Sequence, residues 1–246
     1  MKNPPGDKEC FTVNLIVRAD GTKLPAQVIL KTAAKGGQLT EKYIQKLNGP
    51  ANIQVKSAPK AWWSYKFDDE LITELFPKWQ EETVFLRDCF SVHLMAEIVA
   101  RLESVNVHQI VIPPGMTGEL QPLDVGINKP FKDYVREKYR QWRMGNISFT
   151  AKGYIKKPGK KEFLQFVSKA LEKVSESVVR NSFYAARILD RDRPLPKVGD
   201  VVVVENRDLN ASLIDEADFS EPDECDGSCD DDSDSDDTFC DEECDK

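Results

Sequence analysis

Residues 82–115, ETVFLRDCFSVHLMAEIVARLESVNVHQIVIPPG, decide the fold class. Thr83 to Leu86 is a short apolar run of the kind found in buried strands. An amphipathic helix is predicted over Leu94 to Leu102, and a second short strand over His108 to Ile112, where a Pro-Pro-Gly turn stops it. A strand, a helix and a second strand in succession predict a parallel strand pair in an α/β layer.

Two β-rich runs precede this unit, from Phe11 to Val17 and from Leu24 to Leu30. Asp20-Gly21 lies between them, and this dipeptide is a strong signal for a hairpin. We therefore expect a mixed sheet that is antiparallel at the hairpin and parallel at the strand-helix-strand unit. In open sheets of this kind, ligands bind beyond the carboxyl ends of the strands.

A helix is predicted between the hairpin and that unit, over residues 65–80, YKFDDELITELFPKWQ. Its apolar residues share one face: Leu71, Leu75 and Trp79. Asp68 or Asp69 is the expected N-cap, because a short carboxylate side chain accepts hydrogen bonds from the first backbone amides of a helix.

A further helix is predicted over residues 118–142, GELQPLDVGINKPFKDYVREKYRQW. Its apolar stripe recurs at helical spacing: Leu123, Ile127, Phe131 and Val135. Asp124 lies beside this stripe, and an aspartate in the first turn is usually present because it complements the helix dipole. The alternative is a metal ligand. Asp88 follows one strand and Asp124 opens the helix after the next, so both acids are expected at one crevice.

The charge of the chain is unevenly distributed. Of 42 acidic and 34 basic residues, 17 acids and one lysine lie between Asp215 and Lys246, which leaves 25 acids and 33 basic residues before them. We expect a mildly basic body and a disordered acidic tail, because so charged a segment cannot bury enough surface to fold. Four of the six cysteines lie in this tail, which argues against a secreted disulfide framework. No apolar run approaches the roughly 18 residues of a membrane span, so no membrane association is expected.

Two blocks carry a resemblance to a known family. LRDCFSVHL contains Asp88, and VIPPGMTGELQPLDVGINKPFK contains Asp124, with 35 residues between the two aspartates. Together they resemble the DDE endonuclease domain of pogo and Tigger type transposases and of host genes derived from them. The second block is the more specific, because Pro-Pro-Gly-x-Thr, Leu-Gln-Pro-Leu-Asp and Asn-Lys-Pro-Phe-Lys follow the order and spacing of that family. The resemblance runs from about residue 8 to residue 190.

The resemblance implies an α/β fold of the RNase H-like kind, a mixed sheet flanked by helices. Carried over position by position, Asp88 matches the second catalytic acid, His93 the histidine of the same motif, and Asp124 the third acid. Asp88 and Asp124 are therefore the expected metal ligands, for Mg²⁺ or Mn²⁺. In such enzymes two metal ions roughly 4 Å apart activate a water or a 3′ hydroxyl against a phosphodiester. The implied partner is DNA, and the implied location is the nucleus.

The first acid of the family lies on a strand just before the hairpin. Only MKNPPGDKE precedes the hairpin here, and its prolines and glycine do not suit a buried central strand. We therefore expect an N-terminally truncated domain whose first strand is missing, and DNA binding without strand cleavage. Residues 197–208, KVGDVVVVENRD, favour a strand with Glu205 just beyond its valines. An edge hairpin or a strand on the rim is expected there, and a strand that fills the vacant place is the alternative.

The expected organisation has four parts. They are a partial endonuclease domain over 1–145, a helical extension over 146–196, a short β-rich segment and linker over 197–214, and the acidic tail over 215–246.

Four lysines surround a Pro-Gly turn in this chain, and they are candidates for phosphate contacts: Lys156, Lys157, Lys160 and Lys161. A solvated loop explains them equally well. Two other functions also stay open. The first is a host interaction protein whose acidic tail binds basic partners, and the second is an endonuclease completed by an acid from another chain.

Overall fold

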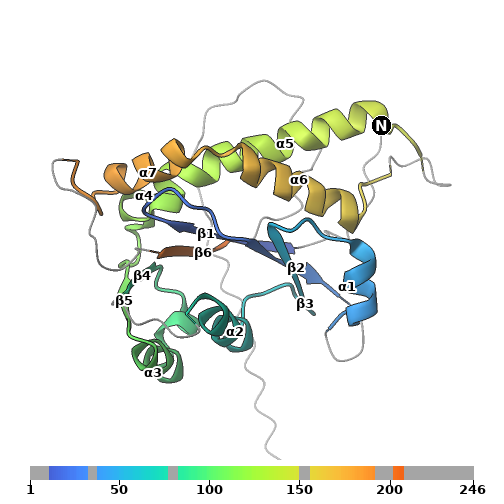
Figure 1. The fold of residues 1–246 in the computed structure, drawn as a ribbon. Coiled ribbons are helices and arrows are strands. Elements are labelled where there is room, and N and C mark those ends of the chain that lie inside the picture. Colours follow the sequence, from blue (N-terminus) through green and yellow to red (C-terminus); the bar gives the residue numbers. More distant parts are fainter. Residues whose placement is uncertain (1–10, 33–37, 77–82, 150–155, 192–201, 208–246) are drawn as a thin grey trace, which may run out of the picture. The chain divides into compact units, whose positions relative to one another are not determined.

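The computed structural model describes residues 11–32, 38–76, 83–149, 156–191 and the strand at 202–207 (Figure 1). The predictions made for the acidic tail and for Trp79 fall outside these residues.

The described chain alternates strands and helices. The strands are β1 (Phe11–Arg18), β2 (Ala26–Lys31), β3 (Ile53–Ala58), β4 (Thr83–Arg87), β5 (Val107–Val111) and β6 (Val202–Arg207). The helices are α1 (Glu41–Leu47), α2 (Tyr65–Leu75), α3 (Ala96–Ser104), α4 (Thr117–Leu120), α5 (Asn128–Gly145), α6 (Lys160–Lys173) and α7 (Glu176–Ala185). Two short helical turns complete the set, the 3₁₀ turn η1 (Ser91–Leu94) and the π-helical turn η2 (Leu123–Ile127).

All six strands form one sheet in the order β3-β2-β1-β6-β4-β5. The predicted hairpin is confirmed, because β1 and β2 pair antiparallel with Phe11 opposite Leu30. Gly21 in its turn has a φ of 101°, a conformation that glycine adopts without steric penalty. The predicted parallel pair is also confirmed, with β4 beside β5 and Leu86 opposite Ile110.

The position of β6 differs from the expectation of an edge or rim strand. It lies inside the sheet, antiparallel to β1 on one side and parallel to β4 on the other. A run of valines is suited to this place, since strands buried between two neighbours consist largely of β-branched residues. The alternative, a strand that fills the place between β1 and β4, is the one observed.

Helices cover both faces of the sheet (Figure 1). One core lies between the sheet and α5, α6 and α7, and it includes the predicted stripe of Leu123, Ile127, Phe131 and Val135. The second core joins α2 and α3 to the opposite face through residues such as Leu71 and Phe85. This mixed sheet flanked by helices confirms the fold class that the resemblance implies.

Helix α6 belongs to the same core as the hairpin. Phe163 packs on Phe11, with 3.6 Å between the ring centroids. Lys23, at the end of the hairpin turn, donates hydrogen bonds to the carbonyls of Leu171, Glu172 and Val174, where α6 ends. A lysine at a helix C-terminus satisfies carbonyls that lack helical partners, so the hairpin and α6 stabilise each other.

Within the described part of the chain, no helix combines the length and the apolar character that a membrane crossing requires.

Candidate functional site

Asp88 follows β4 directly, at the carboxyl end of the strand. Its Oδ1 accepts a hydrogen bond from the backbone amide of Phe90 at 3.3 Å and lies 2.9 Å from Nδ1 of His93. Burial raises the pKa of this carboxyl, but the hydrogen bond and charge of His93, the Phe90 amide and the charge of Arg87 outweigh burial and leave the pKa below its ordinary value. Asp88 is therefore a carboxylate at neutral pH, the form that binds a cation, and its side chain keeps 21% of its surface exposed.

His93 is fully buried between two carboxylates. Its Nδ1 faces Asp88, and its Nε2 lies 3.7 Å from Oδ1 of Asp68. Gln109 of β5 donates a hydrogen bond to the His93 carbonyl at 2.9 Å and so fixes the turn that carries the ring. An imidazole without exposed surface has no direct access to a substrate. Its geometry instead holds one oxygen of Asp88 in place.

Asp68 is the residue that the sequence reasoning placed wrongly. Ser64 occupies the N-cap position of α2, and Asp68 is buried within the first turn. Its Oδ1 accepts hydrogen bonds from Nη2 of Arg87 and, at 3.0 Å, from Nε1 of Trp63. A buried arginine requires an opposite charge, and Asp68 supplies it.

A signal for this ion pair is present in the sequence. Asp68 lies three residues before Leu71 and seven before Leu75, so it belongs to the apolar face of α2 rather than to the exposed one. Arg87 closes an otherwise apolar strand. A charge of each sign on surfaces that are both predicted to be buried indicates a buried pair, and Asp68 and Arg87 meet in the second core.

Asp124 lies in η2, the turn that leads into α5, between the buried side chains of Leu123 and Ile127. Its Oδ1 accepts a hydrogen bond from Nδ2 of Asn128 at 3.0 Å. Gly126 of the same turn lies against Ser182 of α7, closely enough that a Cβ atom on the glycine would come within 2.9 Å of the serine Cβ. Close packing on α7 and the hydrogen bond to Asn128 thus position Asp124. The dipole explanation and the ligand explanation of this residue both remain compatible with its place before α5.

The two aspartates lie on segments that border the same strand. β4, which precedes Asp88, pairs with β6, and η2, which carries Asp124, contacts β6. Carboxylate oxygens are the ligands that Mg²⁺ prefers. Among the side chains that the structure describes, however, no three or more His, Cys, Asp or Glu residues gather into a set able to hold a metal ion. The assignment of Asp88 and Asp124 as ligands of one such ion therefore stays a prediction.

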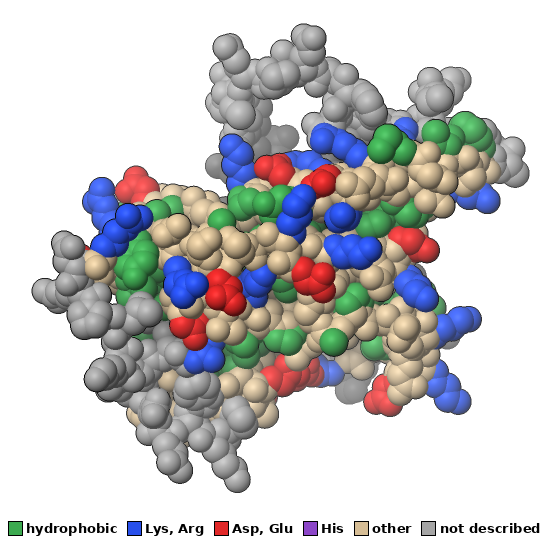
Figure 2. Space-filling view, turned by 45° about the horizontal axis from the view of Figure 1, so that its top comes forward, with side chains coloured by type: hydrophobic (Ala, Val, Ile, Leu, Met, Phe, Trp, Pro, Cys, Tyr) green, Lys and Arg blue, Asp and Glu red, His purple; other side chains and the backbone are tan. Residues whose placement is uncertain are grey.

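The four candidate lysines lie before and at the start of α6. Lys156, Lys157 and Lys161 are exposed and Lys160 is partly exposed, with its ammonium group 5.9 Å from the ring centroid of Tyr43. Figure 2 shows lysine and arginine side chains spread over the face that α5 and α6 form, with acidic side chains among them.

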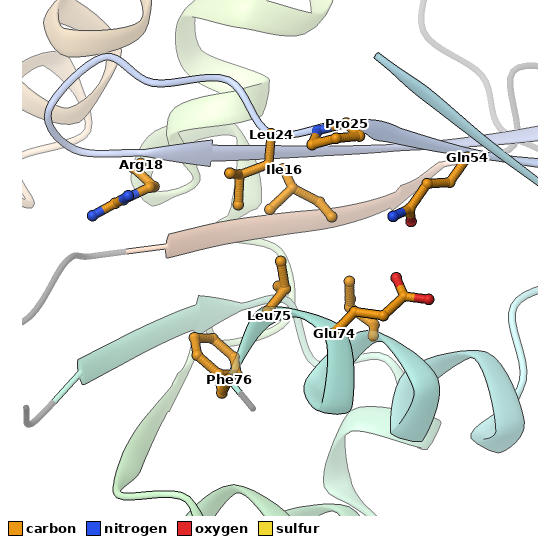
Figure 3. A pocket seen from close by; sticks show the side chains of 9 residues that line it. Ile16, Arg18, Leu24, Pro25, Gln54, Glu74, Leu75 and Phe76 are labelled. Carbon is orange, nitrogen blue, oxygen red and sulfur yellow. The ribbon is translucent and has the colours of Figure 1, made fainter. Parts of the chain in front are cut away.

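Two other features of the surface are an exposed tryptophan and a cavity. Trp62 is 61% exposed, whereas its neighbour Trp63 is buried and bonded to Asp68. A cavity of about 250 Å³ opens between the hairpin and α2 (Figure 3). It is lined mainly by apolar side chains, with Arg18, Gln54 and Glu74 at its margins, and Asp88, His93 and Asp124 are not among its lining residues.

Comparison with known proteins matches residues 8–183 to the family described as DDE superfamily endonuclease. The chain is 29% identical to the pogo transposable element with KRAB domain of Mus musculus and 30% identical to that of Homo sapiens, each over 190 residues. These matches cover 73% of this chain and 29% of each relative. It is also 31% identical over 145 residues to the pogo transposable element with ZNF domain of Homo sapiens, which covers 55% of this chain and 9% of that protein.

The chain therefore spans less than a third of the length of these relatives. No solved structure matches it significantly.

Proposed function

Because the chain belongs to the DDE superfamily of endonucleases, we propose that it binds DNA through the basic surface of α5 and the lysines before and at the start of α6. Members of this superfamily generally use divalent metal ions and act on nucleic acid. The observation that carries the proposal is the charge of α5, which has six lysines and arginines against two acids.

The two acids of α5 are already paired. Asp133 forms an ion pair with Arg136 at 3.0 Å, and Glu137 forms one with Lys173 of α6 at 2.5 Å. Other cations of the helix are partly or fully exposed: Lys129, Lys132, Lys138, Arg140 and Arg143. Helices α5 and α6 pack together through Trp142 and Phe166, so the cations of α5 lie on a helix that adjoins α6, at whose start the four lysines stand. A surface of this kind attracts the phosphate backbone regardless of base sequence.

The test is the salt dependence of binding to a short DNA duplex. Each lysine that contacts a phosphate releases about one counterion, so removal of two such lysines lowers the slope of log affinity against log salt by about two. We expect this from K156Q/K157Q and from K160Q/K161Q, measured by fluorescence anisotropy. The matched control is K60Q/K66Q, which removes two exposed lysines, one before α2 and one in its first turn. Equal slopes for all three variants and the unaltered chain would overturn the assignment of these lysines.

We assign no strand cleavage to the Asp88 and Asp124 pair alone. Two carboxylates hold one divalent ion at most, whereas phosphodiester cleavage by this class of enzyme relies on two ions that share a ligand. The test incubates the full chain with supercoiled plasmid in Mg²⁺ and in Mn²⁺, beside the variant D88A/D124A. Nicking that disappears in the double variant would contradict this part of the proposal, and equal inactivity with DNA affinity retained would support it.

A DNA partner also leads us to infer a nuclear location. Imaging of the tagged full chain in cells tests it, and exclusion of the protein from the nucleus would contradict it.

A further inference from the structure

Phe90 is an exposed aromatic residue two positions after Asp88, and its side chain keeps 37% of its surface exposed. Its backbone amide donates a hydrogen bond to Oδ1 of Asp88 at 3.3 Å. Its ring centroid lies 5.5 Å from the ring centroid of the buried His93. The imidazole that positions Asp88 therefore also supports the ring of Phe90.

His93 covers at most one face of the Phe90 ring. The planes of the two rings meet at 72°, so the edge of one ring points at the face of the other. Whichever ring presents its edge, at least one face of Phe90 is not in contact with the imidazole. A supported aromatic ring with exposed surface is the kind of group on which nucleobases stack.

Phe90 belongs to a set of exposed apolar side chains at one edge of the sheet. Strands β4 and β5 run parallel, so the segments that follow them leave the sheet at the same edge. These two segments carry four large exposed apolar side chains: Phe90, Leu94, Met95 and Met116. Concentration of such side chains at one edge indicates a contact surface, and in open α/β sheets the carboxyl edge is where ligands bind.

The same part of the chain carries little positive charge. From Asp88 to Asn128 there are five acidic residues and one arginine, Arg101, whose Nε lies 3.6 Å from Oδ1 of Asp69. Helix α5, which follows, carries six lysines and arginines. Phosphates are attracted to cations such as those of α5, whereas the stacking of a base on an aromatic ring requires no charge. The composition of this edge therefore favours contact with bases over contact with the phosphate backbone.

We infer that Phe90 is a stacking platform for an unpaired base of DNA whose phosphates are bound by α5 and by the lysines before and at the start of α6. The inference rests on the proposed DNA binding and adds a preference to it. Bases within a duplex are stacked on one another, whereas the bases of a single-stranded extension are free to stack on a side chain. The chain is therefore expected to favour DNA that carries unpaired bases.

The first experiment measures the affinity of the full chain, by fluorescence anisotropy without metal, for a duplex with a short single-stranded extension. The reference is the same duplex with an abasic extension of equal length, which keeps every phosphate and removes only the bases. We expect the extension with bases to bind at least about fivefold more tightly, which is the low end of what one stacked base contributes.

Two variants assign this difference to Phe90. F90A is expected to abolish the preference for the extension with bases, and F90W, which keeps an aromatic ring, is expected to retain it. The matched control is W62A, which removes another exposed aromatic side chain and is expected to leave the preference unchanged. Equal preferences in F90A and in the unaltered chain would overturn the inference.

A second measurement uses the unaltered chain and does not depend on the folding of F90A. An extension that contains 5-iodouracil is irradiated in the complex, which links the base to an aromatic ring stacked on it, and mass spectrometry identifies the linked peptide. We expect the link at Phe90. Links at Trp62 or at other residues, with none at Phe90, would contradict the inference.

The outcomes separate this inference from the proposed function. If the lysine variants lower the salt slope as described above but the two extensions bind equally, the lysine surface stands and the role of Phe90 fails. If the lysine variants leave the slope unchanged while F90A still abolishes the preference, the role of Phe90 stands and the lysine surface fails. A dimer that F90A dissociates, with the preference unaltered, would make this edge an interface between two copies of the chain and would refute base stacking.

Discussion

The imidazole Nδ1 of His93 lies 2.9 Å from Oδ1 of Asp88, and the ring itself has no exposed surface. The buried side chain of His93 thus holds the partly exposed carboxylate of Asp88 in place. The far side of the ring faces the buried pair of Asp68 and Arg87, so the position of Asp88 depends on a chain of contacts that runs into the second core.

Replacement of His93 by alanine is expected to lower the free energy of unfolding by roughly 2 to 4 kcal/mol, because it opens a cavity and leaves buried polar groups without partners. The chain offers a matched control in His108, an exposed histidine on β5. His108→Ala is expected to change stability by less than about 0.5 kcal/mol. Urea denaturation of both variants measures the difference, and equal stabilities would contradict the role given to His93.

Two adjacent aspartates of α2 provide a second comparison. Asp68 is fully buried beside Arg87, whereas Asp69 is partly exposed and lies 3.6 Å from Nε of Arg101. Asp68→Ala leaves a buried guanidinium without its counter-charge and is expected to destabilise the fold by about 3 to 5 kcal/mol. Asp69→Ala removes a surface ion pair and is expected to have an effect below about 1 kcal/mol. The prediction fails if denaturant unfolding gives the two variants similar stabilities.

Local patterns sufficed for much of the fold. Asp20-Gly21 between two β-rich runs predicts the hairpin, and the spacing of Leu123, Ile127, Phe131 and Val135 predicts a helix buried on one side, because both signals depend only on neighbouring residues. The two sequence blocks that resemble the DDE family made Asp88 and Asp124 the candidate ligands. The place of β6 was not predictable in this way, since a valine-rich strand fits many sheet positions and the choice among them depends on partners more than a hundred residues away.

The hairpin turn gives a prediction about pH. Oδ1 of Asp20 accepts a hydrogen bond from the amide of Thr22 at 2.8 Å. Burial raises the pKa of Asp20, but the hydrogen bonds of Thr22 and the charges of Arg18 and Arg180 outweigh burial and leave the pKa below its ordinary value of 3.8. Such a carboxylate adds stability above its unfolded pKa, and this contribution is lost as the pH falls through the lower folded pKa.

Asp20→Asn keeps a side-chain oxygen that can accept the hydrogen bond from the Thr22 amide, and it removes the charge. The variant is expected to be less stable than the unaltered chain at neutral pH, by less than about 1 kcal/mol because the residue is exposed. The difference between the two proteins should shrink as the pH falls below the ordinary pKa of 3.8, and it should vanish once the carboxyl of the folded chain is protonated. Urea denaturation over a pH series measures it, and a difference that stays constant with pH would refute the titration of Asp20 as its cause.

The last prediction concerns the packing of η2, the turn that carries Asp124, against α7. A Cβ atom at Gly126 would lie 2.9 Å from Cβ and 3.4 Å from Cα of Ser182, and neither atom is the end of a flexible side chain. Gly126→Ala must therefore push η2 away from α7, and we expect a loss of about 1 to 3 kcal/mol in the free energy of unfolding. At Gly118 in α4 an added Cβ meets nothing within 4 Å, so Gly118→Ala is expected to be neutral or stabilising by up to about 1 kcal/mol.

Ser182→Gly removes the opposing Cβ, and a double-mutant cycle with Gly126→Ala is expected to show favourable coupling of about 0.5 kcal/mol or more. Additive effects in that cycle would mean that the two residues do not meet, and η2 would then need another explanation for its position.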